Sequence, residues 1–446
     1  MNHRSPHILF VNPWIHDFAA YDVWAKPVGL LSIAAILRMH GFSISYIDCL
    51  DRFHPKAKPS DPMSRNGRGP YLKTRIPPPK GLEAVGRRFS RYGILPEWFT
   101  EDLKSIPKPD VILITCLMTY WYPGLFETIR AIRTVFPQTP IILGGIYATL
   151  CHAHATRYSG ADHIVTGAGE KKILELIGII TGKNQTLNFD PDNLNTYPYP
   201  AFDLQRKTGY IPLLTSLGCP FSCAYCASNF LQPNHMKRHP DLVAEEILYW
   251  HDKFGVKEFA FYDDALLVNA DQHAVPMFNR IIKTGRNLRF HTPNAVHIRK
   301  ITSQIAVLMF KAGVKTLRMG LETTDFTMRE MDRKVKEAEF IQAVSYLLEA
   351  GFQKEQVGAY LLVGLPGQSV ASVELSIKTV QKSGITPILA YYSPIPHTDM
   401  WEAAKAASRY DLEADPVFTN NAVMPCQKGA FDWDELTRLK QRVKFP

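Results

Sequence analysis

Three of the seven cysteines of this chain lie within eight residues of one another. They are Cys219, Cys223 and Cys226, in the spacing C-x3-C-x2-C. Chance would place three cysteines at these offsets on the order of once in a thousand chains of this cysteine content. An odd number of cysteines in a long chain does not suggest a secreted disulfide framework, and clustered thiolates in a reducing compartment are more often metal ligands. The cysteines therefore predict a metal centre.

The spacing leaves three kinds of centre open. A structural zinc site would take four ligands in a C-x2-C…H-x3-H pattern, namely Cys223, Cys226, His235 and His239. Its eight-residue spacer is shorter than the usual ~12, and Cys219 would be left over. A ferredoxin-type [4Fe–4S] site needs a fourth cysteine, and the only downstream candidate is the distant Cys426. Three thiolates on a four-iron cluster would leave one iron open, and an open metal position can bind a substrate or a cofactor.

The apolar pattern in the second half of the chain predicts the strands and helices that position these cysteines. Six short apolar runs alternate with helical patterns such as 241–255 and 337–351, which predicts six strand–helix units. The expected strands are 211–216, 257–262, 288–292, 315–320, 357–363 and 386–392. Six units are too few for a closed eight-stranded barrel, so a partial (βα)6 barrel is predicted. The cysteines follow its first strand, at the mouth where barrel enzymes keep their chemistry.

The first half also alternates strands with helices. Apolar runs at 7–12, 42–48, 110–116 and 140–145 predict a parallel sheet covered on both faces, that is, a Rossmann-like α/β domain. Gly144, Gly145 and Gly167 each follow an expected strand. Open α/β sheets bind ligands at these carboxyl ends.

Positive charge is concentrated in one segment of the chain. The net charge is +9, and residues 51–108 hold 13 Lys and Arg against 6 Asp and Glu, a balance of +7. The remainder is near neutral, so the charge is not a general nucleic-acid-binding coat. This Pro-rich segment is predicted to be a solvated loop or a lid over an anionic group. Tyr120, Trp121 and Tyr122 are expected in the core or as a wall over a bound ring.

The cysteine stretch "CPFSCAYC" (219–226) resembles the signature of the radical S-adenosylmethionine (SAM) superfamily, with Tyr225 in the aromatic slot before the last cysteine. The resemblance implies a [4Fe–4S] cluster held by Cys219, Cys223 and Cys226. It also implies that SAM chelates the open iron and is cleaved reductively to a 5′-deoxyadenosyl radical.

Other motifs resemble the SAM-binding strand ends of that superfamily, in the expected order. "FYDDALL" (261–267) carries Asp263 and Asp264 where many members have Gly-Gly-Glu, at the amino end of SAM. Glu322 in "RMGLET" resembles a ribose-contacting residue. Gly364, Leu365 and Pro366 in "AYLLVGLPGQS" resemble the motif that lies against the adenine. "YYSPIPHTDM" (391–400) resembles the stretch after strand six, with His397 in place of the usual Gly.

The first half resembles the amino-terminal domain of the cobalamin-binding class of this superfamily. The shared stretches are "KPVGLLSIAAILRMHGFSISYID", "LGGIYA" and "GAGE", which imply a cobalamin site near Gly144, Gly145 and Gly167. Many such domains carry D-x-H-x-x-G, whose His ligates cobalt. Here "DCLDRFHP" has Asp48 and His54 at a different spacing. Two hypotheses remain: cobalamin binds without a protein ligand, or the domain keeps only its fold.

These observations predict the organisation of the chain. The Rossmann-like domain is expected over 1–186 with the basic insertion 51–108, a linker over 187–206, the barrel over 207–400 and a carboxyl-terminal extension over 401–446. No apolar run reaches the ~18 residues of a membrane span, and the first residues lack a signal peptide, so a cytoplasmic protein is expected.

The expected activity is hydrogen abstraction from a small organic substrate, leading to cobalamin-dependent methylation of a carbon. Rearrangement, cyclisation or oxidation by the same enzyme class is the alternative. An iron–sulfur sensor or electron carrier is the alternative outside enzymes, although a carrier needs no nucleoside pocket. The partners implied are an external electron donor such as flavodoxin or ferredoxin, with no membrane and no nucleic acid. No residue is assigned to catalysis itself.

Overall fold

The computed structural model of this chain describes residues 5–183, 185–326, 331–332, 335–427 and 433–444. The chain divides into two compact units, and a short segment near its end belongs to the first. The first unit consists of 1–209 and 415–417, the second of 210–414 and 418–446. Within the described ranges, no helix combines the length and the apolar character that a membrane crossing requires.

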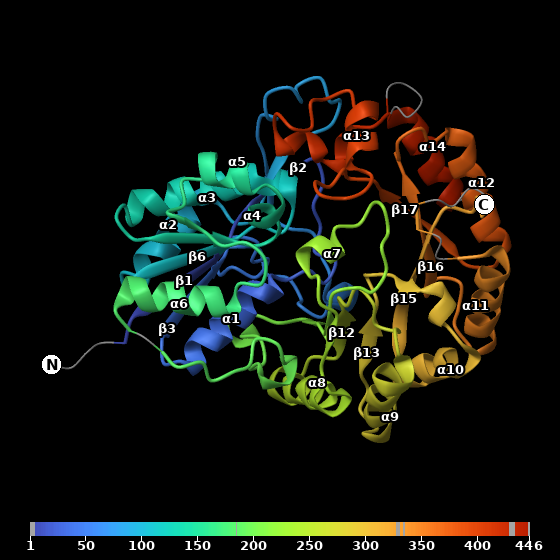
Figure 1. The fold of residues 1–446 in the computed structure, drawn as a ribbon, viewed down its shortest axis with the longest axis horizontal. Helices are drawn as coiled ribbons and strands as arrows, with labels where there is room; N and C mark the ends of the chain where they lie inside the picture. Colours follow the sequence, from blue (N-terminus) through green and yellow to red (C-terminus); the bar gives the residue numbers. More distant parts are fainter. Residues whose placement is uncertain (1–4, 184, 327–330, 333–334, 428–432, 445–446) are drawn as a thin grey trace. The chain divides into compact units, whose positions relative to one another are not determined.

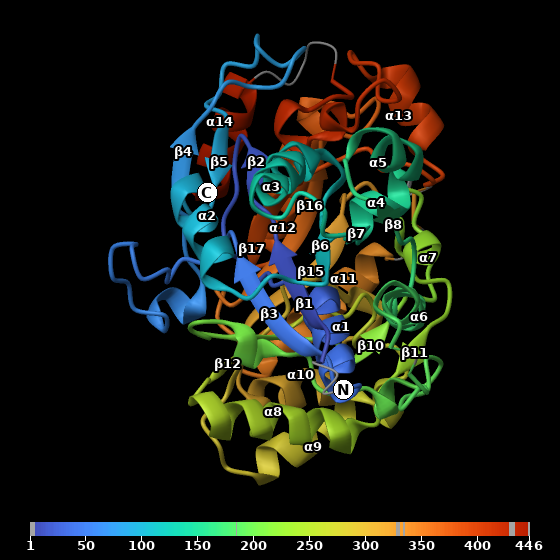
Figure 2. The same ribbon diagram turned by 90° about the vertical axis from the view of Figure 1, so that its left-hand side faces the viewer.

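The first unit is built on a five-stranded parallel sheet of order β3-β1-β6-β7-β8 (Figure 2). Its strands are β1 (His7–Asn12), β3 (Ser43–Asp48), β6 (Val111–Thr115), β7 (Ile141–Gly144) and β8 (His163–Ile164). The helices that follow them are α1 (Val28–Met39), α3 (Tyr122–Val135), α4 (Ile146–Leu150), α5 (His152–Tyr158) and α6 (Glu170–Thr181). β1 and β6 are buried along their whole length, as parallel strands between helical layers are.

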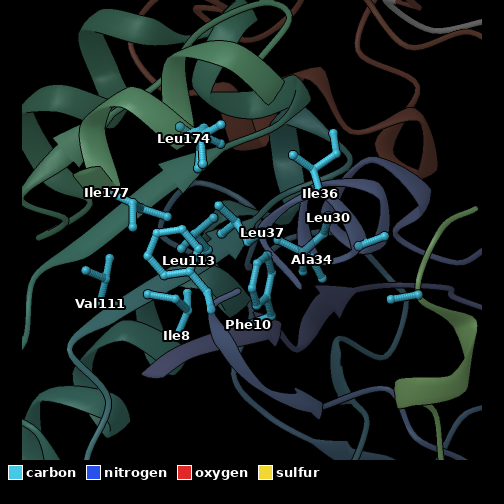
Figure 3. Packing of buried hydrophobic residues seen from close by; sticks show 14 of the residues in the cluster. Ile8, Phe10, Leu30, Ala34, Ile36, Leu37, Val111, Leu113, Leu174 and Ile177 are labelled. Carbon is cyan, nitrogen blue, oxygen red and sulfur yellow. The ribbon is translucent and has the colours of Figure 1, made fainter. Parts of the chain in front are cut away.

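A hydrophobic core joins α1 and α6 to one face of this sheet (Figure 3). Ile8 and Phe10 point to this face from β1, because side chains two residues apart share a face of a strand. Leu30 and Leu37 of α1 and Ile177 of α6 pack against them. The predicted Rossmann-like layering is therefore confirmed.

The basic segment 51–108 contains two short strands and a helix in addition to its loops. Within it, β4 (Lys73–Arg75) and β5 (Ser90–Tyr92) form an antiparallel sheet with β2 (Ile15–Asp17), and α2 (Pro96–Ser105) follows. Phe99 and Leu103 of α2 are fully buried. A few apolar residues, spaced widely among Pro, Gly and Arg, thus anchor the end of the segment.

The second unit is built on six parallel strands that pair in chain order, β9-β12-β13-β15-β16-β17. The strands are β9 (Ile211–Leu213), β12 (Glu258–Phe261), β13 (Arg289–His291), β15 (Val314–Glu322), β16 (Val357–Val363) and β17 (Thr386–Tyr391). The connecting helices line the outer side of the strands (Figure 1): α8 (Pro240–Phe254), α9 (Ala274–Lys283), α10 (Ser303–Ala312), α11 (Glu337–Glu349) and α12 (Val370–Lys382). This is the predicted partial (βα)6 barrel.

Short elements complete the second unit. β10 (Ser216–Leu217) pairs with β11 (Met236–Lys237), and α7 (Ser228–Leu231) lies between them. β14 (Val296–His297) pairs with the end of β15. The carboxyl-terminal extension adds α13 (Trp401–Ala407) and α14 (Trp433–Lys444), and α14 packs against α12 and β17.

Candidate active site: the cysteine loop and the strand ends around it

The three clustered cysteines lie on the loop between β10 and α7, after the first strand of the barrel. All three thiols are free of disulfides; Cys223 is buried, Cys219 is half-buried and Cys226 is exposed. The Ser228 N–H points at Cys226 Sγ over 3.4 Å, as a donor to a thiolate would. Three thiols on one loop, none of them in a disulfide and one with a backbone donor at its sulfur, are the donor set that an iron–sulfur cluster takes. Among the described residues, no three Cys, His, Asp or Glu side chains form a group that could hold a single metal ion.

Backbone conformation and distant contacts fix this loop. Gly218 opens it with φ of 75°, and a Cβ there would lie 2.7 Å from Asn234 O, so only glycine fits. Ala224, between the last two cysteines, donates its N–H to Met331 O and accepts one from Met400 N. The loop is therefore held by segments that are remote in sequence.

Tyr225 and Glu322 meet across 97 residues of sequence. The Tyr225 hydroxyl donates to Glu322 Oε1 over 2.7 Å, and Glu322 is buried at the end of β15. Burial, together with the Glu322 charge, raises the pKa of Tyr225 far above its usual range. Glu322 itself has φ of 61°, a left-handed conformation that costs a non-glycine residue about 1–2 kcal/mol. Such strain commonly marks functional positions.

Adjacent aspartates after β12 have different environments. Asp263 is buried, and its Oδ1 accepts three hydrogen bonds, from Thr215 N at 2.9 Å, Thr215 Oγ1 at 2.7 Å and Ser216 Oγ at 2.7 Å. Burial raises the pKa of Asp263 to about 6, against the opposing effect of these bonds. Asp264 is exposed and accepts a hydrogen bond from Ser228 Oγ, two residues after Cys226. Asp263 thus braces the ends of β9 and β12, whereas Asp264 lies beside the cysteine loop.

The Gly364–Pro366 turn at the end of β16 is covered by the carboxyl-terminal extension. Gly364 has φ of 92° and donates its N–H to Gln368 Oε1 at 2.8 Å. Gln427 Nε2 donates to Leu365 O over 2.6 Å, and a Cβ on Gly364 would lie 2.8 Å from Met424 Cε. Neither Gln427 nor Met424 could be predicted as part of the site, because neither belongs to a recognisable motif.

Two further residues near the loop have defined environments. Cys426 is buried in an apolar cluster with Leu365 and Tyr392, and burial raises the pKa of its thiol to about 12. Its Sγ lies 3.6 Å from Ala404 O, as expected for a packed core thiol. His397 has φ of 67° and stacks on Phe230 of α7 at 4.2 Å, which joins the β17 loop to the cysteine loop.

Glycines leave room at the carboxyl edge of the first unit's sheet. Gly145 follows β7 with φ of 93°, and a Cβ there would overlap the Thr115 hydroxyl and lie 3.0 Å from Cys116 O. Gly167 follows β8 with φ of 68°, and no atom lies within 4 Å of its Cβ position. A Cβ on Gly144 would meet only Val165 O, at 3.6 Å. Neither Gly144 nor Gly167 places a side chain at this edge, and the Gly167 N–H donates to Thr149 Oγ1 over 3.1 Å.

Other residues singled out in this unit are packed. The His54 ring stacks on Trp98 with 4.9 Å between the ring centroids, and its Nε2 lies 3.4 Å from Asp102 Oδ2. These two contacts hold the ring within the fold. Tyr120 is buried, Trp121 donates from Nε1 to Asp17 over 2.7 Å, and Tyr122 donates to Asp415 over 2.8 Å. These aromatic residues belong to the core.

Comparisons with known proteins agree with this architecture. Residues 213–380 match the model of the radical SAM superfamily, and residues 93–177 match that of the B12 binding domain. The structure is similar to that of the radical S-adenosylmethionine methyltransferase TsrM from Kitasatospora setae, with a TM-score of 0.66 and 16% identity over 91% of this chain and 78% of that one. The fold and the cysteine loop together define a radical SAM enzyme.

Several curated proteins are similar to this chain in sequence. An uncharacterized methyltransferase of Pyrococcus horikoshii is 25% identical over 69% of this chain and 72% of its own length. Cytidylyl-2-hydroxyethylphosphonate methyltransferase of Streptomyces wedmorensis is 20% identical over 86% and 78%. An anaerobic magnesium-protoporphyrin IX monomethyl ester cyclase of Rubrivivax gelatinosus is 23% identical over 74% and 64%. The chain belongs to the radical SAM superfamily, in the class that carries a B12-binding domain.

Asp263→Asn is expected to remove part of the pH dependence of stability. The native pKa of about 6 lies above the unfolded value of about 3.9, so native Asp263 retains a proton that the unfolded chain releases. Its contribution to stability is present at low pH and is lost as pH rises from about 4 to 6. Two pKa units correspond to about 3 kcal/mol.

Urea unfolding of the apo-protein at pH 4 and pH 7 measures this effect. The free energy of unfolding should fall more with rising pH in the wild type than in Asp263→Asn, while Asp264→Asn should resemble the wild type. If the free energy of unfolding depended on pH in the same way in the wild type and in Asp263→Asn, the raised pKa of Asp263 would be contradicted.

Gly145→Ala is expected to destabilise the first unit by about 2 kcal/mol or more, because positive φ and overlap with Thr115 and Cys116 act together. Gly167→Ala is the matched control: it has the same unfavourable φ but open space, so about 1 kcal/mol is expected. Thermal unfolding compares the two variants. Equal losses would show that the close approach at Gly145 is not a constraint.

Proposed function

We propose that this chain is a cobalamin-dependent radical SAM methyltransferase that methylates a carbon of a small organic molecule. The observation that carries the proposal is the C-x3-C-x2-C loop, which is hydrogen-bonded through Tyr225 to the end of β15, in a chain that also has a B12-binding domain. Similarity to TsrM and to two curated methyltransferases supports methyl transfer as the outcome.

Each group of residues has a proposed role. Cys219, Cys223 and Cys226 would hold the cluster, and Asp264 with Ser228 would face the amino end of SAM. When bound, the cluster and SAM supply a 5′-deoxyadenosyl radical and cobalamin supplies a methyl group.

The remaining predicted residues would orient the nucleoside and the corrin. Tyr225 holds the Glu322 carboxylate in place for the ribose, and the Gly364–Pro366 turn would lie against the adenine. Asp263 would act on SAM indirectly, by bracing the strand ends. Gly144, Gly145 and Gly167 would leave room for cobalamin at the sheet edge.

The proposed setting is a reducing cytoplasm with an external one-electron donor, such as flavodoxin or ferredoxin. None of the seven cysteines forms a disulfide, which suits such a compartment. Similarity to magnesium-protoporphyrin cyclases makes oxidative cyclisation the second candidate, because these relatives are 22–27% identical.

The proposal is tested by anaerobic reconstitution with iron, sulfide and hydroxocobalamin, followed by desalting and addition of SAM and a strong reductant. We expect 5′-deoxyadenosine together with retained cobalamin. The variant with Cys219, Cys223 and Cys226 all changed to Ala should lack the cluster absorbance and form no 5′-deoxyadenosine.

Other outcomes separate the alternatives. 5′-Deoxyadenosine without retained cobalamin would keep the radical enzyme and overturn the methyltransferase. A full cluster with neither product nor cobalamin would indicate a sensor or an electron carrier. Retained [4Fe–4S] absorbance in the triple variant would refute the ligand assignment.

Glu322→Ala is expected to weaken SAM binding about tenfold or more while leaving iron content unchanged, because a buried charged hydrogen-bonding group is lost. Equilibrium binding of SAM to the reconstituted protein measures the effect. Tyr225→Phe, which removes only the hydroxyl that orients Glu322, should give a smaller loss in the same direction. Normal SAM affinity in Glu322→Ala would show that the end of β15 does not contact SAM.

A further inference from the structure

His297 lies next to the first cysteine of the loop, although 78 residues separate them in sequence. Its Nε2 is 3.9 Å from Cys219 Sγ. The backbone of His297 is fixed because β14 pairs in parallel with β15, where His297 is opposite Gly320, two residues before Glu322. The same strand end that positions Glu322 thus also positions an imidazole at a cysteine sulfur.

Phe221 holds the imidazole ring in this orientation. Phe221 lies within the cysteine motif itself, and its ring centroid is 4.2 Å from that of His297, at an interplanar angle of 56°. His297 is therefore packed between a residue of the cysteine loop and the end of β15. A side chain held on both sides loses little rotamer freedom when it makes a weak bond to sulfur.

The surroundings of His297 are cationic. A cavity of about 90 Å³ is lined by His297, Phe221, Ile298, Arg299, Lys300 and Val335. The Arg299 guanidinium lies 3.7 Å from Glu339, and the Arg299 side chain is 47% exposed. Solvent screens an exposed charge, so Arg299 should influence the cysteine sulfur less than the adjacent imidazole does.

Adding an electron to an iron–sulfur cluster increases its negative charge. N–H donors to the ligand sulfurs stabilise that charge, and the reduction potential depends on such bonds and on solvent exposure. Groups behind the ligands commonly tune a metal centre in this way. An N–H from His297 directed at the Cys219 thiolate would therefore favour the reduced cluster, the form needed to cleave SAM.

We infer that His297 is a positioning residue that sets the reduction potential of the cluster by donating a hydrogen bond to the Cys219 thiolate. The inference rests on the proposed function, because it requires Cys219 to be a cluster ligand. It assigns a role to a residue outside every motif that carries the family resemblance.

The test is an EPR-monitored redox titration of the reconstituted protein, with iron and sulfide content measured in the same samples. His297→Phe keeps an aromatic ring against Phe221 but removes the donor. It should make one-electron reduction about tenfold less favourable, a shift of about 59 mV to lower potential for a one-electron couple. His297→Gln, whose amide N–H can replace the imidazole donor, should restore most of the wild-type potential.

Arg299→Ala is the matched control, because Arg299 lines the same cavity and its side chain is 47% exposed, so that solvent screens its charge. It should change the reduction equilibrium less than twofold. A shift in Arg299→Ala as large as that in His297→Phe would overturn the inference in favour of a general charge effect. So would a wild-type potential in His297→Phe with full iron content.

If His297→Phe assembles no cluster, the hydrogen bond is tested instead by comparing the reduction potentials of His297→Gln and of His297→Asn, whose side chain is shorter. A lower potential in His297→Asn than in His297→Gln supports the hydrogen bond, and equal potentials overturn it. Failure of this inference is distinguishable from failure of the proposed function. In the first case the wild type still holds a cluster, forms 5′-deoxyadenosine and retains cobalamin, and in the second case at least one of these three is missing.

Discussion

The candidate site depends on the hydrogen bond from Tyr225 to Glu322. This bond links the loop that carries the three cysteines to the end of β15 at 2.7 Å, across 97 residues of sequence. It forms in a buried setting, where a carboxylate without partners would be costly, so the two elements constrain one another. Because β14 also pairs with this end of β15, the position of His297 beside Cys219 follows from the same constraint.

The carboxyl-terminal extension supports this arrangement within the second unit. Gln427 and Met424 pack on the Gly364–Leu365 turn, and Met400 donates its backbone N–H to Ala224 of the cysteine loop. Cys426 belongs to the same apolar cluster as Leu365. The extension is therefore part of the framework that holds two proposed cofactor-binding segments, which explains why its cysteine is buried as a neutral thiol.

In the first unit, the proposed cobalamin site is formed by backbone at glycine positions more than by side chains. Gly144 and Gly167 leave the carboxyl edge of the sheet open, whereas Gly145 is required by its close approach to Thr115 and Cys116. His54, the histidine in the stretch that corresponds to the family's cobalt-ligand motif, is stacked on Trp98. Because His54 is packed in this way, we propose that cobalamin binds without a histidine ligand from this stretch.

The sequence by itself determined the α/β class, the six-stranded order of the second unit and the cysteine triad. These features are local: apolar periodicity defines each strand, parallel strands joined by helices pair in chain order, and the cysteines lie within eight residues. Only the tertiary structure decided which of two adjacent aspartates is buried, that Gln427 and Met424 cover the Gly364 turn, and that His297 lies beside Cys219. It also anchored the basic segment through Phe99 and Leu103. Such contacts join residues tens of positions apart, and a local pattern holds no information about which distant side chain will fill a given space.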